Sequence, residues 1–315
     1  MKFEDFKRKV NLKNVVVSRI ENLINNGYST EVIERTKLKL EQCSDHTFAK
    51  KCKGCGADYF VGSNSCNNRF CPVCAKKRSL KYLATLIPAF ERYLKQGCTV
   101  HLLTFTMKNT NNFITGLDTI LKAFRYLTNG NKYYANIFKF MFVGGVKSLE
   151  VIRGESDIKS YHPHLHCLVI KNKFTRDFDI LKEFWNNSLN VVMGTQNEKL
   201  GSIDIVQVKN PNSKSNKQNL NDVRTGLLET LKYITKVEDI FNYDDEMLSN
   251  FINYSHNRRY VSVFGYLAKL SKALNEDLTE SAKDQVGKVC KHCGCTEFEF
   301  ISEFTNKIGP LEDFD

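Results

Sequence analysis

The chain has 315 residues, of which 42% are hydrophobic and 26% are charged, and its net charge at pH 7 is +11. A chain of this length can bury a substantial core and form two domains. The excess of Lys and Arg favours a polyanionic partner, because contacts with phosphates release condensed counterions. The sequence shows no signal-peptide pattern and no run of 18 apolar residues, so we expect a cytoplasmic protein that does not enter a membrane.

The first part of the chain combines a helical segment with a cysteine-rich segment. Residues 3–40 have apolar positions at helical spacing. Two Cys-x-x-Cys pairs follow, and their spacing predicts one tetrahedral zinc site in a zinc-ribbon-like module. The four predicted ligands are Cys52, Cys55, Cys71 and Cys74. In an alternative site, the second pair is joined by Cys66 and by a further partner such as His46.

A basic stretch surrounds the second cysteine pair and continues into an apolar helix that reaches about residue 96. A zinc module with such a patch can hold a DNA backbone, because Lys and Arg side chains bind phosphates. The candidate DNA-binding residues are Arg69, Lys76, Lys77, Arg78 and Lys81.

Strand-like and helix-like segments alternate in the middle of the chain. The predicted strands cover 99–108, 146–153, 161–171 and 203–209. The predicted helices cover 117–142, with a break near Asn129 and Gly130, then 175–193 and 223–236. Polar turn or loop residues occupy 154–160 and 210–221. The order β-α-β-β-α-β, followed by a helix, predicts an α+β fold with a central antiparallel sheet of ferredoxin-like order and helices packed on it.

The strand predicted over 161–171 carries three of the seven histidines of the chain within five residues. Alternate side chains of a strand share a face, so His162, His164 and His166 lie on the same side. Three imidazoles on one face are typical of a metal site.

The preceding strand adds a carboxylate to this face if the two strands form a hairpin. With Arg153 opposite Tyr161, Glu150 falls opposite His164. Two imidazoles and one carboxylate leave coordination positions open for water and a phosphate oxygen. A register shifted by one residue would turn Glu150 away and bring Glu155 or the first histidine to the site instead.

The helix predicted over 223–236 carries a second group of reactive side chains. Glu229, Tyr233 and Lys236 follow one another along one side of it. A tyrosine with a carboxylate and a lysine nearby can act as a nucleophile, although its pKa of about 10 requires such neighbours at neutral pH. The same spacing is also common on solvated helix faces.

A further cysteine group, Cys290, Cys293 and Cys295 with His292, lies near the C-terminus. A loop this short seldom wraps four ligands around one ion. The group is therefore either half of a zinc site that is completed elsewhere or a reducible tail.

Three segments resemble the motifs of HUH endonucleases, in the same order along the chain. HPHLHCLVI at 162–170 resembles the histidine motif, LLTFT at 102–106 the first conserved strand, and LKYITK at 231–236 the catalytic-tyrosine helix. CNNRFCPVCAKKRSLKYL at 66–83, together with ETLKYITK, is similar to the single-tyrosine Rep proteins that initiate rolling-circle replication of small plasmids in Gram-positive bacteria. The resemblance covers about residues 50–240.

The resemblance implies an enzyme that nicks the double-strand origin of a plasmid. Tyr233 would be the nucleophile of a 5′-phosphotyrosyl link, and Glu229 the general base of the terminating cleavage. The family implies Mg or Mn as the catalytic metal, and the host DNA polymerase and helicase as partners.

The resemblance also implies His164 and His166 as metal ligands, with Glu150 as the third. His162 has three open roles: a further ligand, a neighbour of the ligands or a DNA contact.

Other functions share some of these features. An HUH-type transposase would have the same histidine strand, whereas a relaxase usually has its tyrosine near the N-terminus. A non-catalytic, zinc-dependent DNA-binding regulator would use the histidines structurally and form no covalent adduct with DNA. The expected regions are a helical segment at 1–45, a cysteine-rich module with the basic helix at 46–96, a nicking domain at 97–270 and a tail at 271–315.

Overall fold

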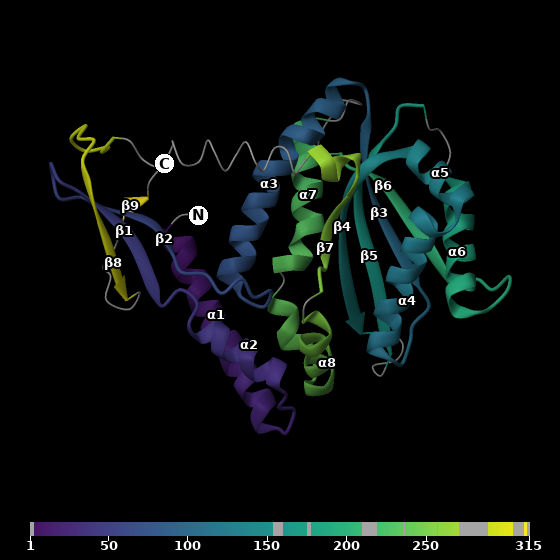
Figure 1. The fold of residues 1–315 in the computed structure, drawn as a ribbon, viewed down its shortest axis with the longest axis horizontal. Coiled ribbons are helices and arrows are strands. Elements are labelled where there is room, and N and C mark those ends of the chain that lie inside the picture. Colours follow the sequence, from purple (N-terminus) through teal and green to yellow (C-terminus); the bar gives the residue numbers. More distant parts are fainter. Residues whose placement is uncertain are drawn as a thin grey trace. The chain divides into compact units, whose positions relative to one another are not determined.

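The computed structural model describes residues 3–153, 160–174, 178–209, 219–235, 237–256, 258–270, 289–304 and 312–313. The contacts between residues divide the chain into two compact units (Figure 1). The first unit comprises Met1–Lys81, Thr235–His256 and Glu276–Asp315, and the second comprises Tyr82–Ile234 and Asn257–Asn275.

The helices of the first unit pack through apolar positions at helical spacing. They are α1 (Phe3–Asn25), α2 (Glu31–Glu41) and α8 (Asp245–Ser255). Thr30 caps α2 by accepting a hydrogen bond from the backbone N–H of Ile33, and Asp244 caps α8 in the same way. Ile20, Ile33 and Ile252 share one buried core. The helical pattern predicted over residues 3–40 is confirmed.

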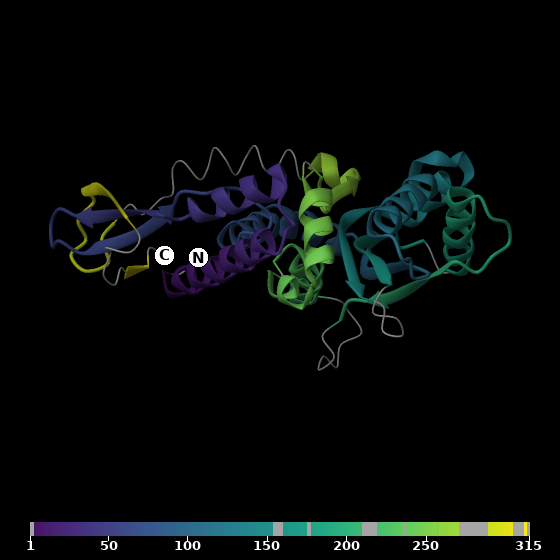
Figure 2. The same ribbon diagram turned by 90° about the horizontal axis from the view of Figure 1, so that it is seen from below.

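The first unit also contains a four-stranded sheet in the order β8-β1-β2-β9. Its strands are β1 (His46–Cys52), β2 (Asp58–Ser63), β8 (Phe298–Phe304) and β9 (Glu312–Asp313). Because β1 pairs antiparallel with both β2 and β8, a strand near the C-terminus lies beside an N-terminal hairpin (Figure 2). The ring of Phe60 in β2 lies 5.2 Å from that of Phe3 and 4.8 Å from that of Phe6. Aromatic packing thus joins the hairpin to α1.

The expected borders at residues 45, 96 and 270 do not coincide with these units. Strand β8, from the expected tail, pairs with β1, and residues 235–256, from the expected nicking domain, belong to the first unit. The basic helix α3 (Pro72–Lys95) is continuous, and its residues from Tyr82 onward count with the second unit. Pro72 occupies its first position, where the missing N–H is tolerated.

The second unit is built on a five-stranded antiparallel sheet in the order β6-β3-β5-β4-β7. Its strands are β3 (Thr99–Met107), β4 (Phe142–Arg153), β5 (Tyr161–Lys171), β6 (Gly201–Gln207) and β7 (Val261–Gly265). The four predicted strands are present and β7 adds an edge strand that was not predicted. The predicted α+β fold with a central antiparallel sheet is confirmed.

Helices cover both faces of this sheet (Figure 1). On one side lie α3 and α7 (Leu220–Thr235), and on the other lie α4 (Phe113–Arg125), α5 (Lys132–Met141) and α6 (Asp179–Met193). Leu168 and Ile170 of β5 share a buried core with α3 and α7. Phe105 of β3 faces the other way, with its ring 5.4 Å from Phe124 of α4 and 4.9 Å from Trp185 of α6. The predicted break near residue 129 is a π-helical turn over Tyr126–Gly130.

Among the described residues, none of the helices combines the length and the apolar character needed to cross a membrane.

Candidate metal centres

The hairpin of β4 and β5 has the register predicted from the sequence. Arg153 pairs with Tyr161, and Glu150 pairs with His164. The carboxylate oxygen of Glu150 and one ring nitrogen each of His164 and His166 lie within 4.8 Å of one another. The three side chains that were expected to share a metal ion are therefore grouped, whereas His162 lies outside this group.

The geometry of the three side chains suits a divalent cation. Glu150 Oε2 lies 2.9 Å from His166 Nε2 and 3.9 Å from His164 Nδ1. Thr104 Oγ1 lies 3.2 Å from the other ring nitrogen of His166 and fixes the orientation of that ring. All three side chains are at least largely buried. Two imidazoles and one carboxylate are a donor set that Mn²⁺ accepts, and they leave positions open for substrate oxygens.

His164 is held in the form that can bind a metal. Burial, and the nearby imidazole of His162, lower its pKa to about 4, so it is neutral at pH 7. Within the described residues, its buried Nε2 has no hydrogen-bond partner. A neutral imidazole with an unused nitrogen is ready to act as a ligand. His162 instead places its Nδ1 2.6 Å from Asn109 Oδ1.

Helix α7 lies on the same face of the sheet as the histidines. His164 and His166 share a side of β5 with Leu168, because alternate residues of a strand face the same way. A Cβ atom at Gly226 of α7 would lie 2.8 Å from Val208 Cγ1 and 3.1 Å from Leu168 Cδ1. The absence of a side chain at Gly226 therefore allows α7 to approach the histidine strand closely.

The predicted tyrosine group is described only in part. Glu229 is half-buried on α7, three residues after Gly226, and position 233 follows in the last turn of this helix. The side chain of Tyr233 and all of Lys236 lie outside the described residues. Positions 226, 229 and 233 succeed one another along one side of the helix, since its period is 3.6 residues.

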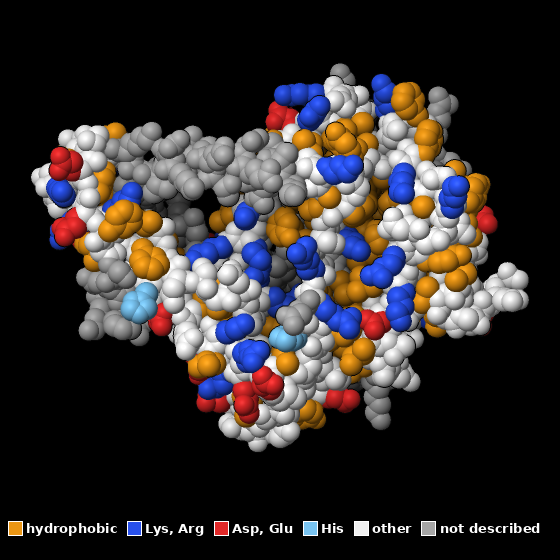
Figure 3. Space-filling model, in the orientation of Figure 1, with side chains coloured by type: hydrophobic (Ala, Val, Ile, Leu, Met, Phe, Trp, Pro, Cys, Tyr) orange, Lys and Arg blue, Asp and Glu red, His pale blue; other side chains and the backbone are white. Residues whose placement is uncertain are grey.

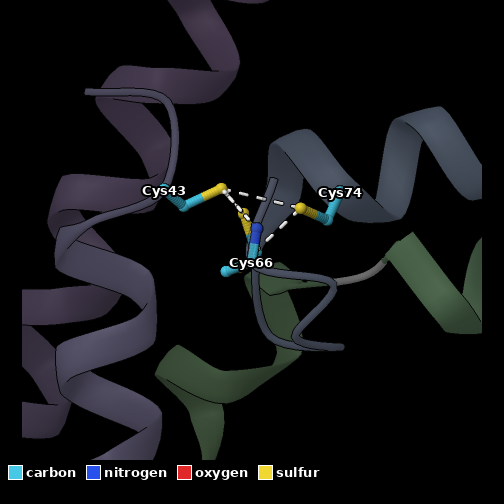
Figure 4. Close-up of side chains that lie close together, drawn as sticks. Cys43, Cys66 and Cys74 are labelled. Carbon is cyan, nitrogen blue, oxygen red and sulfur yellow. Dashed lines mark hydrogen bonds between the residues drawn. The ribbon is translucent and has the colours of Figure 1, made fainter. Parts of the chain in front are cut away.

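The first cysteine cluster lies where α2, the loop before α3 and the start of α3 meet (Figure 4). Its sulfur atoms come from Cys43, Cys66, Cys71 and Cys74. The Sγ atom of Cys43 lies 3.4 Å from that of Cys71 and 3.6 Å from that of Cys74. The Sγ atoms of Cys66 and Cys74 are 3.7 Å apart. These distances are much too long for a disulfide, and they are close to the separation of about 3.8 Å between sulfurs 2.3 Å from a tetrahedral zinc.

The second cysteine cluster joins the β1–β2 hairpin to the C-terminal segment. Its sulfur atoms come from Cys52, Cys55, Cys290 and Cys293. Cys52 Sγ lies 3.6 Å from Cys293 Sγ, and Cys55 Sγ lies 3.5 Å from Cys290 Sγ. Both clusters can therefore hold a metal such as zinc.

In each cluster, two of the four thiols have a lowered pKa and two have a raised pKa, because neighbouring thiols share hydrogen bonds. Hydrogen bonds from the Cys66 and Cys71 thiols lower the pKa of Cys43 to about 6. In the second cluster, the hydroxyl of Tyr59, 3.3 Å from Cys290 Sγ, lowers the pKa of that thiol to about 6. A thiolate is the form in which cysteine binds metal ions.

The prediction that Cys52, Cys55, Cys71 and Cys74 share one ion is wrong, because the structure divides these residues between the two clusters. The alternative that joins Cys66 to the second pair is closer, but its fourth member is Cys43 and not His46. Cys43 is an isolated cysteine after α2, and no spacing pattern could identify it. Cys295 is not part of the second group; its sulfur accepts a hydrogen bond from the backbone N–H of Glu297.

The Cys-x-x-Cys pairs of the second cluster differ in sequence from the Cys71–Cys74 pair of the first cluster. Cys55 and Cys293 are each followed by a glycine, Gly56 and Gly294, with a positive φ of 76° and 72°. Cys74 is followed by Ala75 inside α3. The glycine is the signal that could have matched the first pair with the C-terminal group.

Several of the candidate DNA-binding residues have partners within the first unit. Lys77 Nζ donates to the backbone oxygen of Ser63 at 2.9 Å, and Arg78 donates to the backbone oxygen of Asn67 at 2.9 Å. Lys76 forms an ion pair with Asp5 at 3.9 Å, and Arg69 lies over the ring of Phe251. Lys81 is exposed. Lys77 and Arg78 thus brace the loop that carries Cys66. Figure 3 shows many further Lys and Arg side chains on one face of the molecule.

Comparison with known proteins identifies the family. A family described as "Replication protein" (Rep_1) matches residues 59–307. A "Protein rep" of Bacillus amyloliquefaciens is 27% identical over 289 residues, which cover 85% of this chain and 80% of that protein. A "Protein rep" of Streptococcus pneumoniae is 24% identical over 272 residues, which cover 82% and 78%. No solved structure matches the chain at a significant level.

The match includes strands β3 to β6, helix α7, three cysteines of the first cluster and two of the second. It thus contains the segments whose motifs resemble rolling-circle initiators, and the relatives come from Gram-positive bacteria. The chain belongs to the Rep family of replication proteins, as a rolling-circle plasmid initiator.

Proposed function

We propose that this protein starts plasmid replication by nicking one strand of the double-strand origin, in a metal-dependent reaction. The observation that carries the proposal is the packing of α7 on the face of the sheet that bears Glu150, His164 and His166. This packing brings the helix of Tyr233 to the side of the sheet where a metal-bound phosphate would lie. A metal group and a nucleophile helix on one face fit phosphoryl transfer better than a purely structural role.

In the proposed reaction, the phenol oxygen of Tyr233 attacks the scissile phosphorus. The P–O bond to the 3′ oxygen breaks, and that oxygen leaves as a 3′-OH after it takes up a proton. The product is a 5′-phosphotyrosyl link, and the 3′-OH primes the host polymerase after a host helicase opens the duplex. A bound Mg²⁺ or Mn²⁺ would polarise the phosphate and offset its growing negative charge.

The residues around the metal group would position the ligands. Glu150 Oε2 lies 2.9 Å from His166 Nε2, and both side chains would be ligands of the ion. Thr104 keeps the ring of His166 in place. Glu229 would take a proton from the water that ends replication, while Lys236 would stabilise negative charge near the tyrosine.

We further propose zinc as the structural metal of both cysteine clusters. Four sulfur atoms at nearly tetrahedral separations support Zn²⁺, which prefers thiolate ligands in closed sites. The origin DNA would lie along basic residues such as Lys81 and Arg69, through contacts with its phosphates.

Nicking of a supercoiled plasmid tests the proposal. The protein is incubated with plasmid that carries the origin and with Mn²⁺, and relaxed DNA with protein at its 5′ end is expected. Tyr233→Phe should abolish this adduct, whereas Tyr266→Phe, which changes an exposed tyrosine, should not. Glu229→Gln should keep the first cleavage and lose hydrolytic release.

If Tyr233→Phe still formed the adduct, the nucleophile would be a different tyrosine, and Tyr243, Tyr254 and Tyr260 would be tested next. No nicking by the wild type under any divalent metal would favour the non-catalytic regulator. A transposase would instead join its nicked ends to unrelated DNA.

A further inference from the structure

The β1–β2 hairpin and the C-terminal segment carry the same short turn. Residues 52–56 read CKGCG and residues 290–294 read CKHCG. In the first turn, Gly56 N–H donates to the Cys52 oxygen at 2.9 Å; in the second, Gly294 N–H donates to the Cys290 oxygen at 2.9 Å. Each turn is also closed by a hydrogen bond from its first cysteine, to the oxygen of Ala57 and of Cys295. The turns are thus two copies of one ligand-presenting loop.

The copies pack directly on each other although they are far apart in sequence. Cys55 and Cys290 are separated by 235 positions, and their sulfurs lie 3.5 Å apart. A Cβ atom at Gly54 would lie 3.0 Å from Cys295 Cβ and 3.2 Å from Cys293 Sγ. A side chain at position 54 would push the second turn away, so glycine is needed here for close approach.

Apart from the β1–β8 ladder, the described residues of the C-terminal segment bury little apolar surface. The buried core around this cluster consists of Cys52, Tyr59 and Cys290, with a few partly buried neighbours. Phe300, at the middle of β8, is 70% exposed. An edge strand with so small a core cannot be held by apolar burial alone, and small modules of this kind depend on a metal.

We propose that one zinc ion, bound by Cys52, Cys55, Cys290 and Cys293, is a clasp that fastens β8 to the N-terminal hairpin. The inference rests on the proposed zinc binding and concerns the role of the second ion alone. Closing so long a loop restricts the unfolded chain strongly, which favours the folded state. The ion of the first cluster has a separate role, because all its ligands precede residue 75.

Zinc content and hydrogen exchange of the intact chain test the clasp. The wild type should contain about two zinc ions per chain. In the double variant Cys290→Ser/Cys293→Ser the content should fall to about one, and the amides of β1 and β8 should exchange at least tenfold faster. The amides of α1 and α2 should keep their protection, which shows that the rest of the unit is folded.

Two further variants separate the clasp from a general loss of structure. Gly54→Val keeps all four thiols but should lower zinc content and β8 protection through crowding. Cys295→Ser, which removes a cysteine outside the ligand group, should change neither.

If the double variant still contained two zinc ions, the assignment of Cys290 and Cys293 as zinc ligands would be wrong. One ion with an undisturbed β1–β8 ladder would overturn the clasp while leaving zinc binding intact. Nicking by the wild type is measured separately, so a failure of the catalytic proposal is distinguishable from either result.

Discussion

Glu150 lies directly opposite His164 in the β4–β5 ladder, yet its carboxylate approaches His166 more closely. Glu150 Oε2 is 2.9 Å from His166 Nε2 and 3.9 Å from His164 Nδ1. The carboxylate therefore lies between two imidazoles and contacts both ring systems from the neighbouring strand. Its removal would leave an incomplete donor set, whichever imidazole nitrogens bind the ion.

Replacing Glu150 with Gln should weaken the binding of Mn²⁺ by at least about tenfold and slow nicking accordingly, because the anionic ligand is lost. The amide keeps the size of the side chain, so the fold should be retained. Metal titration by calorimetry, together with plasmid nicking over a range of Mn²⁺ concentrations, measures the effect. Glu183→Gln, on the exposed surface of α6, is the matched control. Equal Mn²⁺ affinity in Glu150→Gln and the wild type would contradict a ligand role.

The five-stranded sheet of the second unit could be predicted because its elements are local in sequence. Runs of β-branched and apolar residues identified β3 and β5, and alternation identified β6. The register predicted first for β4 against β5 agrees with the observed pairing. The edge strand β7 was missed because its five residues carry too weak a pattern.

The cysteine clusters could not be assigned in the same way. Pairing of ligands by proximity in sequence joined Cys52 to Cys71, whereas the fold joins Cys52 to Cys293, which is 241 positions away. Cys43 has no partner in any short motif, so its role depends on where α2 ends. Such long-range groupings are set by tertiary packing and leave few local signals.

Replacing Gly226 should destabilise the second unit, less with alanine than with leucine. An alanine gains about 1 kcal/mol in helix propensity, and this gain offsets only part of the crowding of its Cβ against Val208 and Leu168. A leucine should destabilise the second unit by about 1–3 kcal/mol and displace α7 from the sheet. Thermal unfolding should show a lower midpoint for Gly226→Leu, and the plasmid assay should show reduced adduct. Leu228→Ala, at an exposed position of the same helix, serves as control. Wild-type nicking in Gly226→Leu would mean that the close approach of α7 is unimportant.

Lys77 and Lys81 should differ in what they support, although both belong to the basic segment. The ammonium of Lys77 donates to the Ser63 oxygen at 2.9 Å and to Ser65 Oγ at 2.8 Å. Lys77→Gln should therefore lower the free energy of unfolding by about 1–2 kcal/mol, with loss of zinc from the first cluster. Lys81→Gln, at an exposed position, should cost less stability than Lys77→Gln and should reduce DNA affinity, with a smaller salt dependence. Urea unfolding and DNA binding at several salt concentrations distinguish the two variants. If both variants had the same effects in both assays, Lys77 and Lys81 would not have separate roles.

Residue 101 should make the protein sensitive to mild acid. His101 is 8% exposed, and burial, with Lys171 and Lys209 nearby, lowers its pKa to about 4. Between about pH 6.5 and 4, the unfolded chain therefore binds a proton at this residue that the folded chain resists. The unfolded state then holds more protons, so the free energy of unfolding falls as the pH falls through this window, by about 3 kcal/mol in all.

His101→Gln removes this titration and should flatten the dependence. Urea unfolding of both proteins at pH 7, 5.5 and 4.5 measures it, and the stability difference between variant and wild type should shift in favour of the variant as the pH falls. His164 has the same direction of shift but is present in both proteins, as are the cysteine clusters, so their contributions cancel in the difference. A difference that stays constant from pH 7 to 4.5 would show that His101 titrates alike in the folded and unfolded chains, because only unequal proton binding gives a slope.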